Sequence, residues 1–160
     1  MEHEKIKITA MTKEYSRLIS LWKYDGEYSL YDEDEGNPEG CMDGTHHACT
    51  DEAGELIGYF SFGEDARIPT IEEYIFDDEY LDVGLGLRPD LCGKRMGLSF
   101  LINGLDYAKM MFNTTHFRLS VAAFNERAIK VYKKAGFYTE QEVTHSRSMS
   151  KFFIMKCIRQ

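Results

Sequence analysis

The chain has 160 residues, of which 43% are hydrophobic and 29% are charged, and its formal net charge at pH 7 is −8. This size suits a single domain over residues 1–160, and the acidic balance argues against a nucleic-acid-binding protein while favouring cationic partners such as amines. No apolar run approaches the roughly 20 residues of a membrane helix, and the amino terminus lacks the apolar centre of a signal peptide, so we expect a cytoplasmic protein without membrane contact.

The chain is predicted to begin with a strand and a helix. Residues 5–10 alternate in polarity as a strand does. Thr12 is a suitable helix cap, and apolar side chains recur at helical spacing over residues 13–22. We therefore expect a helix there that packs on a sheet.

Aromatic residues crowd around the Asp25-Gly26 turn that follows. They are Trp22, Tyr24, Tyr28 and Tyr31. They could line a substrate-binding pocket for an acceptor or pack as part of a second short helix, and the sequence leaves both open.

Acidic residues gather in two places, Asp32–Glu35 and Glu72–Glu79. Each group could guide a cationic substrate towards a cleft, or could be a solvated loop.

The next elements are strands. Residues 46–50 and 55–62 predict a hairpin with its turn at 51–54. After a loop, residues 80–87 predict a strand that ends at Arg88-Pro89, because proline cannot continue a ladder.

Alternation divides the strand at 80–87 into two unlike faces. One face carries Leu81, Val83, Leu85 and Leu87, whereas the other has only Asp82 and two glycines, Gly84 and Gly86. Such a bare face suggests that a ligand or another backbone lies close against it, or that the strand carries a bulge.

The last half predicts two helices and three strands. The longest helix spans about 94–112, and a strand over 117–124 leads to Asn125, a good cap for a helix at 126–135 that Gly136 closes. Two strands, 137–144 and 147–158, complete a mixed sheet with helices on its faces.

The four cysteines, Cys41, Cys49, Cys92 and Cys157, are expected to be reduced thiols. The cluster of Cys41, His46, His47 and Cys49 has metal-capable side chains but lacks the spacings of zinc sites. We therefore expect no metal. A metal-dependent regulator built on this cluster is a weak hypothesis.

The segment from strand to helix around Gly93–Gly97 has the properties of an anion site. Free backbone N–H groups and the positive end of a helix dipole suit a phosphate or pyrophosphate, and Lys94 and Arg95 add charge. The Walker pattern fails because Arg95 follows Gly93-Lys94, and the dinucleotide pattern fails because Pro89 stands where its third glycine should be.

Two motifs together resemble the GNAT family of acetyl-CoA-dependent N-acetyltransferases. LGLRPDLCGKRMG, residues 85–97, resembles the family's strand and pyrophosphate loop, and residues 125–137 resemble its N-x-x-A-x-x-x-Y-x-x-x-G-F segment at every fixed position. Within the family the chain looks most like the RimI-related branch. Two residues depart from the loop pattern: Cys92 replaces the usual Arg or Gln, and Arg95 replaces the usual first glycine. Arg95 can still present its N–H if its φ stays negative.

The resemblance implies a central mixed, mostly antiparallel sheet of about seven strands flanked by about four helices, and a homodimer is possible. It implies acetyl-CoA as co-substrate and an amine-bearing acceptor, either a small molecule or a protein N-terminus or lysine. The pantetheine arm would pair with the backbone of Leu85 and Leu87, which would explain the bare face. The implied cofactor-binding residues are Leu85, Gly86, Leu87, Cys92, Gly93, Lys94, Arg95, Met96, Gly97, Leu98, Asn125, Ala128 and Tyr132.

The resemblance also suggests catalytic roles. Tyr132 would protonate the departing thiolate, since a phenol with a pKa of about 10 still holds its proton at neutral pH, although packing alone would also explain it. Asp82 is the first candidate for the base that deprotonates the amine and Glu79 the second, each with an ordinary structural role as the alternative. We expect direct acetyl transfer in a ternary complex; the altered loop leaves a non-catalytic acyl-CoA-binding module as the alternative.

Overall fold

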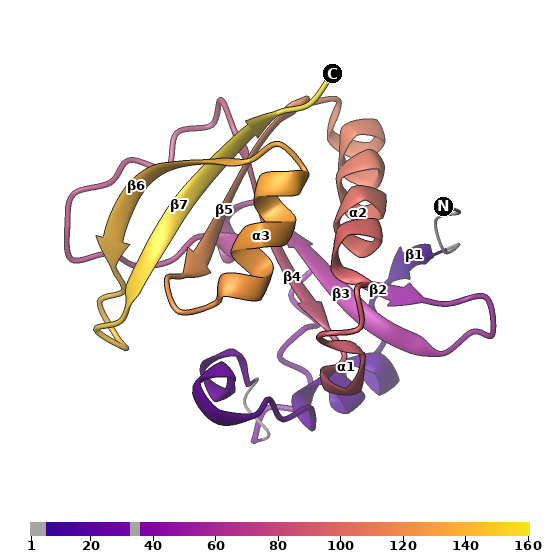
Figure 1. Ribbon diagram of the computed structural model, residues 1–160. Coiled ribbons are helices and arrows are strands. Elements are labelled where there is room, and N and C mark those ends of the chain that lie inside the picture. The colour runs from indigo at the N-terminus through magenta and orange to yellow at the C-terminus, as the bar shows by residue number, and fades with distance from the viewer. Residues whose placement is uncertain (1–5, 33–35) are drawn as a thin grey trace.

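The computed structural model describes residues 6–32 and 36–160 and has the predicted mixed α/β fold (Figure 1). Its seven strands are β1 (Lys7–Ala10), β2 (His46–Thr50), β3 (Leu56–Phe62), β4 (Leu81–Leu87), β5 (His116–Ala122), β6 (Tyr138–Thr144) and β7 (Lys151–Ile158). Its helices are α1 (Lys13–Ser20), α2 (Gly97–Phe112) and α3 (Glu126–Lys134), with 3-10 helices η1 (Gly26–Tyr31), η2 (Glu64–Ala66) and η3 (Pro89–Leu91). Lys5 of the predicted first strand and residues 33–35 of the acidic run lie outside the described residues.

The seven strands form one sheet in the order β1-β2-β3-β4-β5-β7-β6. Every neighbouring pair is antiparallel except β4 and β5, which are parallel. The mostly antiparallel mixed sheet is therefore confirmed, and the second short helix foreseen near the aromatic residues is η1. Among the described residues, no helix has the length and apolar character needed to cross a membrane.

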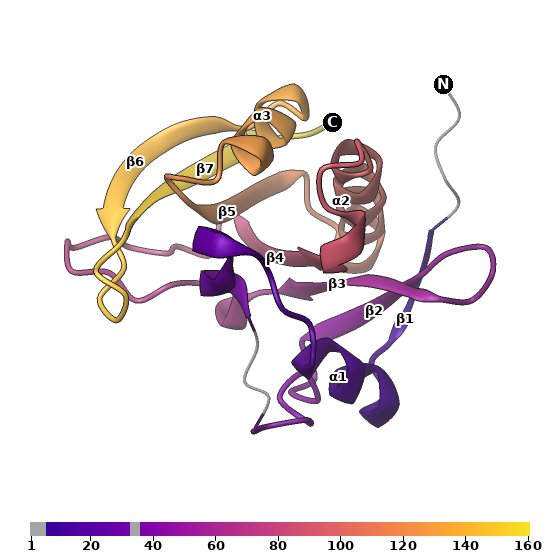
Figure 2. The ribbon, with the colours of Figure 1, turned by 60° about the horizontal axis from the view of Figure 1, so that its bottom comes forward.

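Helices α2 and α3 cover one face of the sheet, and α1 and η1 lie on the other (Figure 2). The main core lies under α2, where the rings of Phe60 and Phe100 stack at 4.6 Å between centroids. Glycine makes this close approach possible: a Cβ on Gly104 would come within 2.2 Å of the Phe60 ring, and one on Gly58 within 2.5 Å of Phe100. Helix and sheet therefore interlock without room for another methyl group.

The opposite face has two smaller apolar clusters. Ile19 of α1 packs with Ala48 and Leu56 on the β1–β3 side. On the β5–β7 side, the long segment 67–80 supplies Tyr74 and Phe76, which pack against a buried cluster in β5, β6 and β7. This segment therefore covers the β5–β7 part of this sheet face.

Local backbone chemistry sets the element boundaries. Thr12 caps α1 and Asn125 caps α3 as predicted, each accepting a backbone N–H three residues on, and Gly136 ends α3 with a φ of 104°. Helix α2 begins at Gly97 instead of Lys94, because the backbone before it contains left-handed residues. Strand β7 begins at Lys151 instead of Arg147, because residues 145–150 form a turn closed by a hydrogen bond from the Met149 N–H to the His145 carbonyl.

Candidate active site

The parallel strands β4 and β5 separate shortly after they meet. Only two pairs join them, Leu81 with Phe117 and Asp82 with Arg118, although β4 continues to Leu87. Beyond this branch point, no strand within residues 6–32 and 36–160 pairs with the β5-facing edge of β4.

The pairing of β4 with β3 determines which backbone groups remain free. The Gly63 N–H donates to the Asp82 carbonyl and the Arg88 N–H to the Ile57 carbonyl, so even-numbered residues of β4 direct their backbone groups at β3. Leu85 and Leu87 therefore direct theirs towards the gap. The hydroxyl of Tyr24 already donates to the Leu87 carbonyl at 2.8 Å across this gap, which shows that a partner there is favourable.

A cavity of about 370 Å³ occupies the gap and reaches both layers of the molecule. Its wall joins β4 and the loop after it, the start of α2, one side of α3, and the aromatic residues of the opposite face. The lining residues are Tyr24, Tyr28, Tyr31, Tyr59, Leu85, Gly86, Leu87, Cys92, Gly93, Arg95, Gly97, Phe100, Asn125, Arg127, Ala128, Lys130, Val131 and Tyr132.

Most residues implied as cofactor-binding come together in this wall, but Lys94, Met96 and Leu98 do not line it. Tyr24, Tyr28 and Tyr31 also line the cavity, whereas Trp22 stacks on Tyr59 at 6.3 Å and packs with the α1 cluster.

The prediction that a ligand or another backbone lies against the bare face of β4 is wrong, because side chains of β3 cover the two glycines. A Cβ on Gly86 would come within 2.3 Å of the Tyr59 ring, and one on Gly84 within 2.5 Å of the Ser61 hydroxyl oxygen. Both neighbours belong to β3, which pairs with β4 in that register. The glycines therefore make room for side chains of the adjacent strand, and the cavity instead meets the edge of β4.

The loop before α2 contains two left-handed residues, Gly93 with a φ of 77° and Arg95 with a φ of 62°. The condition that Arg95 keep a negative φ is thus not met. A left-handed conformation costs a non-glycine residue roughly 1–2 kcal/mol, so the surrounding structure must hold Arg95 in place. Helix α2 has no side-chain cap at Met96, which leaves N–H groups of its first turn available to an anion.

Three basic side chains stand around the cavity: Arg95 from the loop, and Arg127 and Lys130 from α3. Arg127 lies over the Tyr28 ring at 4.5 Å and reaches the loop, since a Cβ on Gly93 would come within 3.1 Å of its Nη1 atom. Arg127 and Lys130 were not foreseen. Their spacing of three residues after the Asn125 cap places them on one helix face, a signal that could have found them.

Tyr132 lines the cavity without a hydrogen-bond partner for its hydroxyl among the described residues. Burial raises its pKa, and the nearby Tyr31 adds to the rise, so the phenol holds its proton at neutral pH. The Tyr31 hydroxyl accepts hydrogen bonds from the Ala122 N–H and from Asn125 Nδ2, both at 3.2 Å. Asn125 thus caps α3 and also fixes a tyrosine of the cavity.

The Cys92 side chain is half-buried in the same wall, with its sulfur 3.7 Å from the Leu87 carbonyl oxygen. Burial raises the pKa of its thiol, so Cys92 is a neutral side chain here.

Asp82 is not placed as the base hypothesis requires. It is 2% exposed, is absent from the cavity wall, and accepts hydrogen bonds from Arg118 Nε and Nη2 at 2.7 Å and from Arg67 Nε at 2.8 Å. Both carboxylate oxygens are thus already hydrogen-bonded to guanidinium groups and do not face the cavity. The geometry therefore favours a structural role for Asp82 at the branch point.

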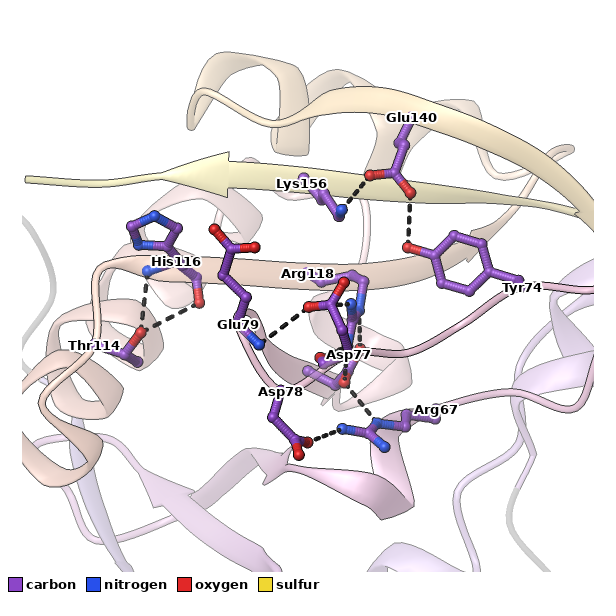
Figure 3. A network of polar contacts seen from close by, with 11 residues as sticks. Arg67, Tyr74, Asp77, Asp78, Glu79, Thr114, His116, Arg118, Glu140 and Lys156 are labelled. Carbon is purple, nitrogen blue, oxygen red and sulfur yellow. Dashed lines mark hydrogen bonds and ion pairs between the residues drawn. The ribbon is translucent and has the colours of Figure 1, made fainter.

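Glu79 also lies outside the cavity wall, and its side chain is exposed. Figure 3 shows it beside the ion-pair network that joins segment 67–80 to β5, where its backbone N–H donates to Asp77 Oδ1 at 3.0 Å. A carboxylate at this position can act on the cavity only through water.

The metal-capable residues do not converge. His46 Nδ1 contacts both carboxylate oxygens of Asp43, at 2.9 and 2.8 Å, while Cys41 and Cys49 are buried. Over residues 6–32 and 36–160, no three potential ligands gather to hold an ion.

A family model described as "Acetyltransferase (GNAT) family" matches residues 8–137. No curated protein sequence matches the chain.

Several solved structures share the fold. A spermidine N-acetyltransferase chimera from Vibrio cholerae and hSSAT has a TM-score of 0.72 at 17% identity, covering 96% of this chain and 95% of that one. A GNAT-family acetyltransferase from Bacillus anthracis has a TM-score of 0.73 at 12% identity, covering 98% and 96%. A Vibrio cholerae spermidine N-acetyltransferase in complex with CoA and spermine has a TM-score of 0.66 at 17% identity, covering 96% and 95%.

The branch-point ion pair predicts a large stability effect. We expect Asp82→Asn to lower the free energy of unfolding by about 3–5 kcal/mol, because it removes the buried carboxylate that binds Nε and Nη2 of Arg118. Urea denaturation measures this change. Asp90→Asn is the matched control: its exposed carboxylate binds Arg88 Nε at 2.6 Å, and we expect a loss below about 1 kcal/mol. Equal losses in the two variants would contradict the role given to Asp82.

The left-handed Arg95 predicts an opposite effect. Arg95→Gly should raise the free energy of unfolding by about 0.5–1 kcal/mol, since glycine adopts a positive φ without steric penalty. The neighbouring Lys94, whose φ is not positive, provides the control: Lys94→Gly should give no gain. Thermal or urea unfolding that shows no difference between the two variants would refute the strain.

Proposed function

The chain belongs to the acetyltransferase (GNAT) family, and from this premise we propose that it moves the acetyl group of acetyl-CoA directly to a primary amine in a ternary complex. The observation that carries the proposal is the cavity at the branch point, where an unpaired strand edge, an anion-binding loop and Tyr132 meet.

The chemistry of the cavity wall fits coenzyme A. Phosphate groups suit the N–H groups at the start of α2 together with Arg95, Arg127 and Lys130. An amide-bearing arm suits the backbone groups that Leu85 and Leu87 direct into the gap, much as an added strand would, although the Leu87 carbonyl already accepts the Tyr24 hydroxyl. These three basic side chains on a chain of net charge −8 therefore support a polyanionic guest at this site.

The same wall supplies groups for acyl transfer. A free N–H of β4 would stabilise negative charge that develops on the thioester oxygen. Tyr132 would give its proton to the departing thiolate and recover one from solvent or from the amine. A phenol is protonated at neutral pH, and Tyr132 presents one to the cavity, which is what this role requires.

The proton of the acceptor amine requires a separate route. The cavity wall contains no Asp or Glu among the described residues, and Asp82 is held by its arginines. We propose that water carries this proton away, with Glu79 as the candidate carboxylate behind it. The acceptor class is supported by the fold neighbours that are spermidine N-acetyltransferases.

A non-catalytic acyl-CoA-binding module is the second candidate function, because Arg95 departs from the loop pattern and adopts a left-handed conformation. The RimI-related branch, a homodimer and a cytoplasmic location stay predictions.

Thiol titration tests the proposal directly. Purified protein is mixed with acetyl-CoA and a panel of polyamines, small amino compounds and peptides with free N-termini. We expect acceptor-dependent release of free thiol. Binding of coenzyme A without thiol release from any acceptor would favour the second candidate.

Tyr132→Phe tests the proposed acid. We expect kcat to fall at least tenfold while the Kd for coenzyme A changes little, because only the proton donor is removed. Tyr15→Phe on α1, away from the cavity, is the matched control and should retain the normal rate. An unchanged kcat in Tyr132→Phe would reduce Tyr132 to a packing role.

A further inference from the structure

Tyr31 closes the β5 side of the gap between β4 and β5. The Ala122 N–H at the end of β5 is directed into this gap, because backbone groups alternate along a strand and the next N–H, that of Ala123, donates to the Lys151 carbonyl of β7 at 2.9 Å. The Tyr31 hydroxyl oxygen accepts the Ala122 N–H at 3.2 Å. A side chain of η1 thus takes the place that a neighbouring strand would have here.

A second donor meets the same oxygen. Asn125 Nδ2 lies 3.2 Å from the Tyr31 hydroxyl, and Asn125 Oδ1 accepts the Ala128 N–H at 3.2 Å as the cap of α3. The cap fixes the orientation of the amide, because its oxygen faces Ala128 and its NH₂ group must then face Tyr31. An amide NH₂ group only donates, so the Tyr31 oxygen is the acceptor in both contacts.

These two contacts leave the hydroxyl hydrogen of Tyr31 unused. A hydroxyl group has one hydrogen to donate and two positions at which it accepts, and N–H groups occupy both of these positions here. Among the described residues, no group accepts the hydrogen itself. Because Tyr31 lines the cavity, this hydrogen is available to a group in that space.

Tyr132 belongs to the same section of the cavity wall. Asn125 and Tyr132 stand at positions i and i+7 of α3, about two turns apart on one face. Helical side chains lean towards the N-terminus, which turns the Tyr132 ring back towards Asn125 and Tyr31. Burial raises the pKa of Tyr132, and Tyr31 is close enough to raise it further. The two phenols therefore share one part of the cavity.

We propose, resting on the proposed function, that Tyr31 returns a proton to Tyr132 after Tyr132 has protonated the departing thiolate. In the first step the O–H bond of Tyr132 breaks and the S–H bond of coenzyme A forms. In the second step the O–H bond of Tyr31 breaks and that of Tyr132 forms again, directly or through one water molecule in the cavity. Solvent then supplies a proton to Tyr31. Because it acts through Tyr132, Tyr31 is a positioning residue and not the acid itself.

The two N–H donors make Tyr31 the better of the two phenols at holding a negative charge. Burial raises the pKa of Tyr31, whereas the contacts with Asn125 and with the Ala122 N–H lower it. No such donor meets the Tyr132 oxygen among the described residues, and burial and Tyr31 both raise the pKa of Tyr132. N–H groups aimed at a phenolate stabilise it as they do an oxyanion. Proton transfer from Tyr31 to a Tyr132 phenolate is therefore favourable.

The opposing explanation is that Tyr31 only anchors η1 over the gap. Tyr24 provides such an anchor on the β4 side, where its hydroxyl donates to the Leu87 carbonyl at 2.8 Å. An anchor at Tyr31 needs the two N–H donors but no transferable proton. The experiment must therefore separate the position of the Tyr31 ring from the proton that it carries.

A double-mutant cycle measures the link between the two phenols. At saturating acetyl-CoA, with an acceptor that supports thiol release, Tyr31→Phe should lower kcat at least about fivefold and change the Kd for coenzyme A less than about twofold. In the Tyr132→Phe background the same change should lower kcat less than about twofold, because the proton has no recipient. Tyr74→Phe is the matched control and should keep the normal kcat: this ring packs against the same buried β5–β7 cluster as Tyr31, its hydroxyl donates to Glu140 at 2.8 Å, and it lies outside the cavity.

Asn125→Asp separates the proton from the position, and it also decides the question if Tyr31→Phe fails to fold. Aspartate caps a helix as well as asparagine does, so α3 should keep its start. The new carboxylate accepts where Nδ2 donated, so Tyr31 stays in place but directs its hydrogen away from the cavity. We expect kcat to fall at least about fivefold. Adding Asn125→Asp to Tyr31→Phe should cause no further fall, which would exclude a direct effect of the new charge on Tyr132.

The outcomes distinguish this inference from the proposed function. A normal kcat in Tyr31→Phe or in Asn125→Asp would overturn the proton role of Tyr31 and leave the acetyltransferase function standing. An equal loss of kcat on Tyr31→Phe with and without Tyr132→Phe would do the same, because the two phenols would then act independently. Absence of thiol release from the normal protein with every acceptor would overturn both.

Discussion

The buried contact between Asp82 and Arg118 is the constraint on which the site depends. These two residues form the last pair that joins β4 to β5, and their side chains meet through two hydrogen bonds of 2.7 Å. Arg118 also donates to the Asp77 carbonyl at 2.9 Å, and Arg67 joins Asp82 to Asp78, so the contact fastens segment 67–80 to the sheet. One ionic cluster therefore holds segment 67–80 against the sheet at the point where β4 and β5 part.

Separation of the strands gives the fold its working surfaces. A continuous parallel ladder would satisfy every backbone group of β4, and no cavity would pass between the layers. The gap instead frees the edge at Leu85 and Leu87 and brings tyrosines of one layer against α3 of the other. Electrostatics reinforces this arrangement, because Arg95, Arg127 and Lys130 concentrate positive charge at the cavity of a strongly acidic chain.

Local patterns predicted the elements well and the contacts between them less well. Periodicity and caps are properties of neighbouring residues, so the seven strands, the Asn125 cap and the Gly136 ending could be predicted. The cover over Gly84 and Gly86 could not, because it depends on the register of β3 against β4.

Contacts between residues far apart in the sequence also decided which catalytic hypotheses failed. Asp82 pairs with an arginine 36 positions away, a contact that no local pattern indicates. The left-handed conformation of Arg95 also escaped prediction, because non-glycine residues rarely adopt it. Tyr132 lines the cavity, whereas its role as an acid stays a prediction.

Amide hydrogen exchange with and without coenzyme A tests the central claim, that the free edge of β4 is the binding surface. Because Leu85 and Leu87 direct their N–H groups into the gap, coenzyme A should slow their exchange strongly. Gly84 and Gly86 direct theirs at β3 and provide an internal control that should change little. Bound coenzyme A that leaves the exchange of Leu85 and Leu87 unaltered would contradict the account.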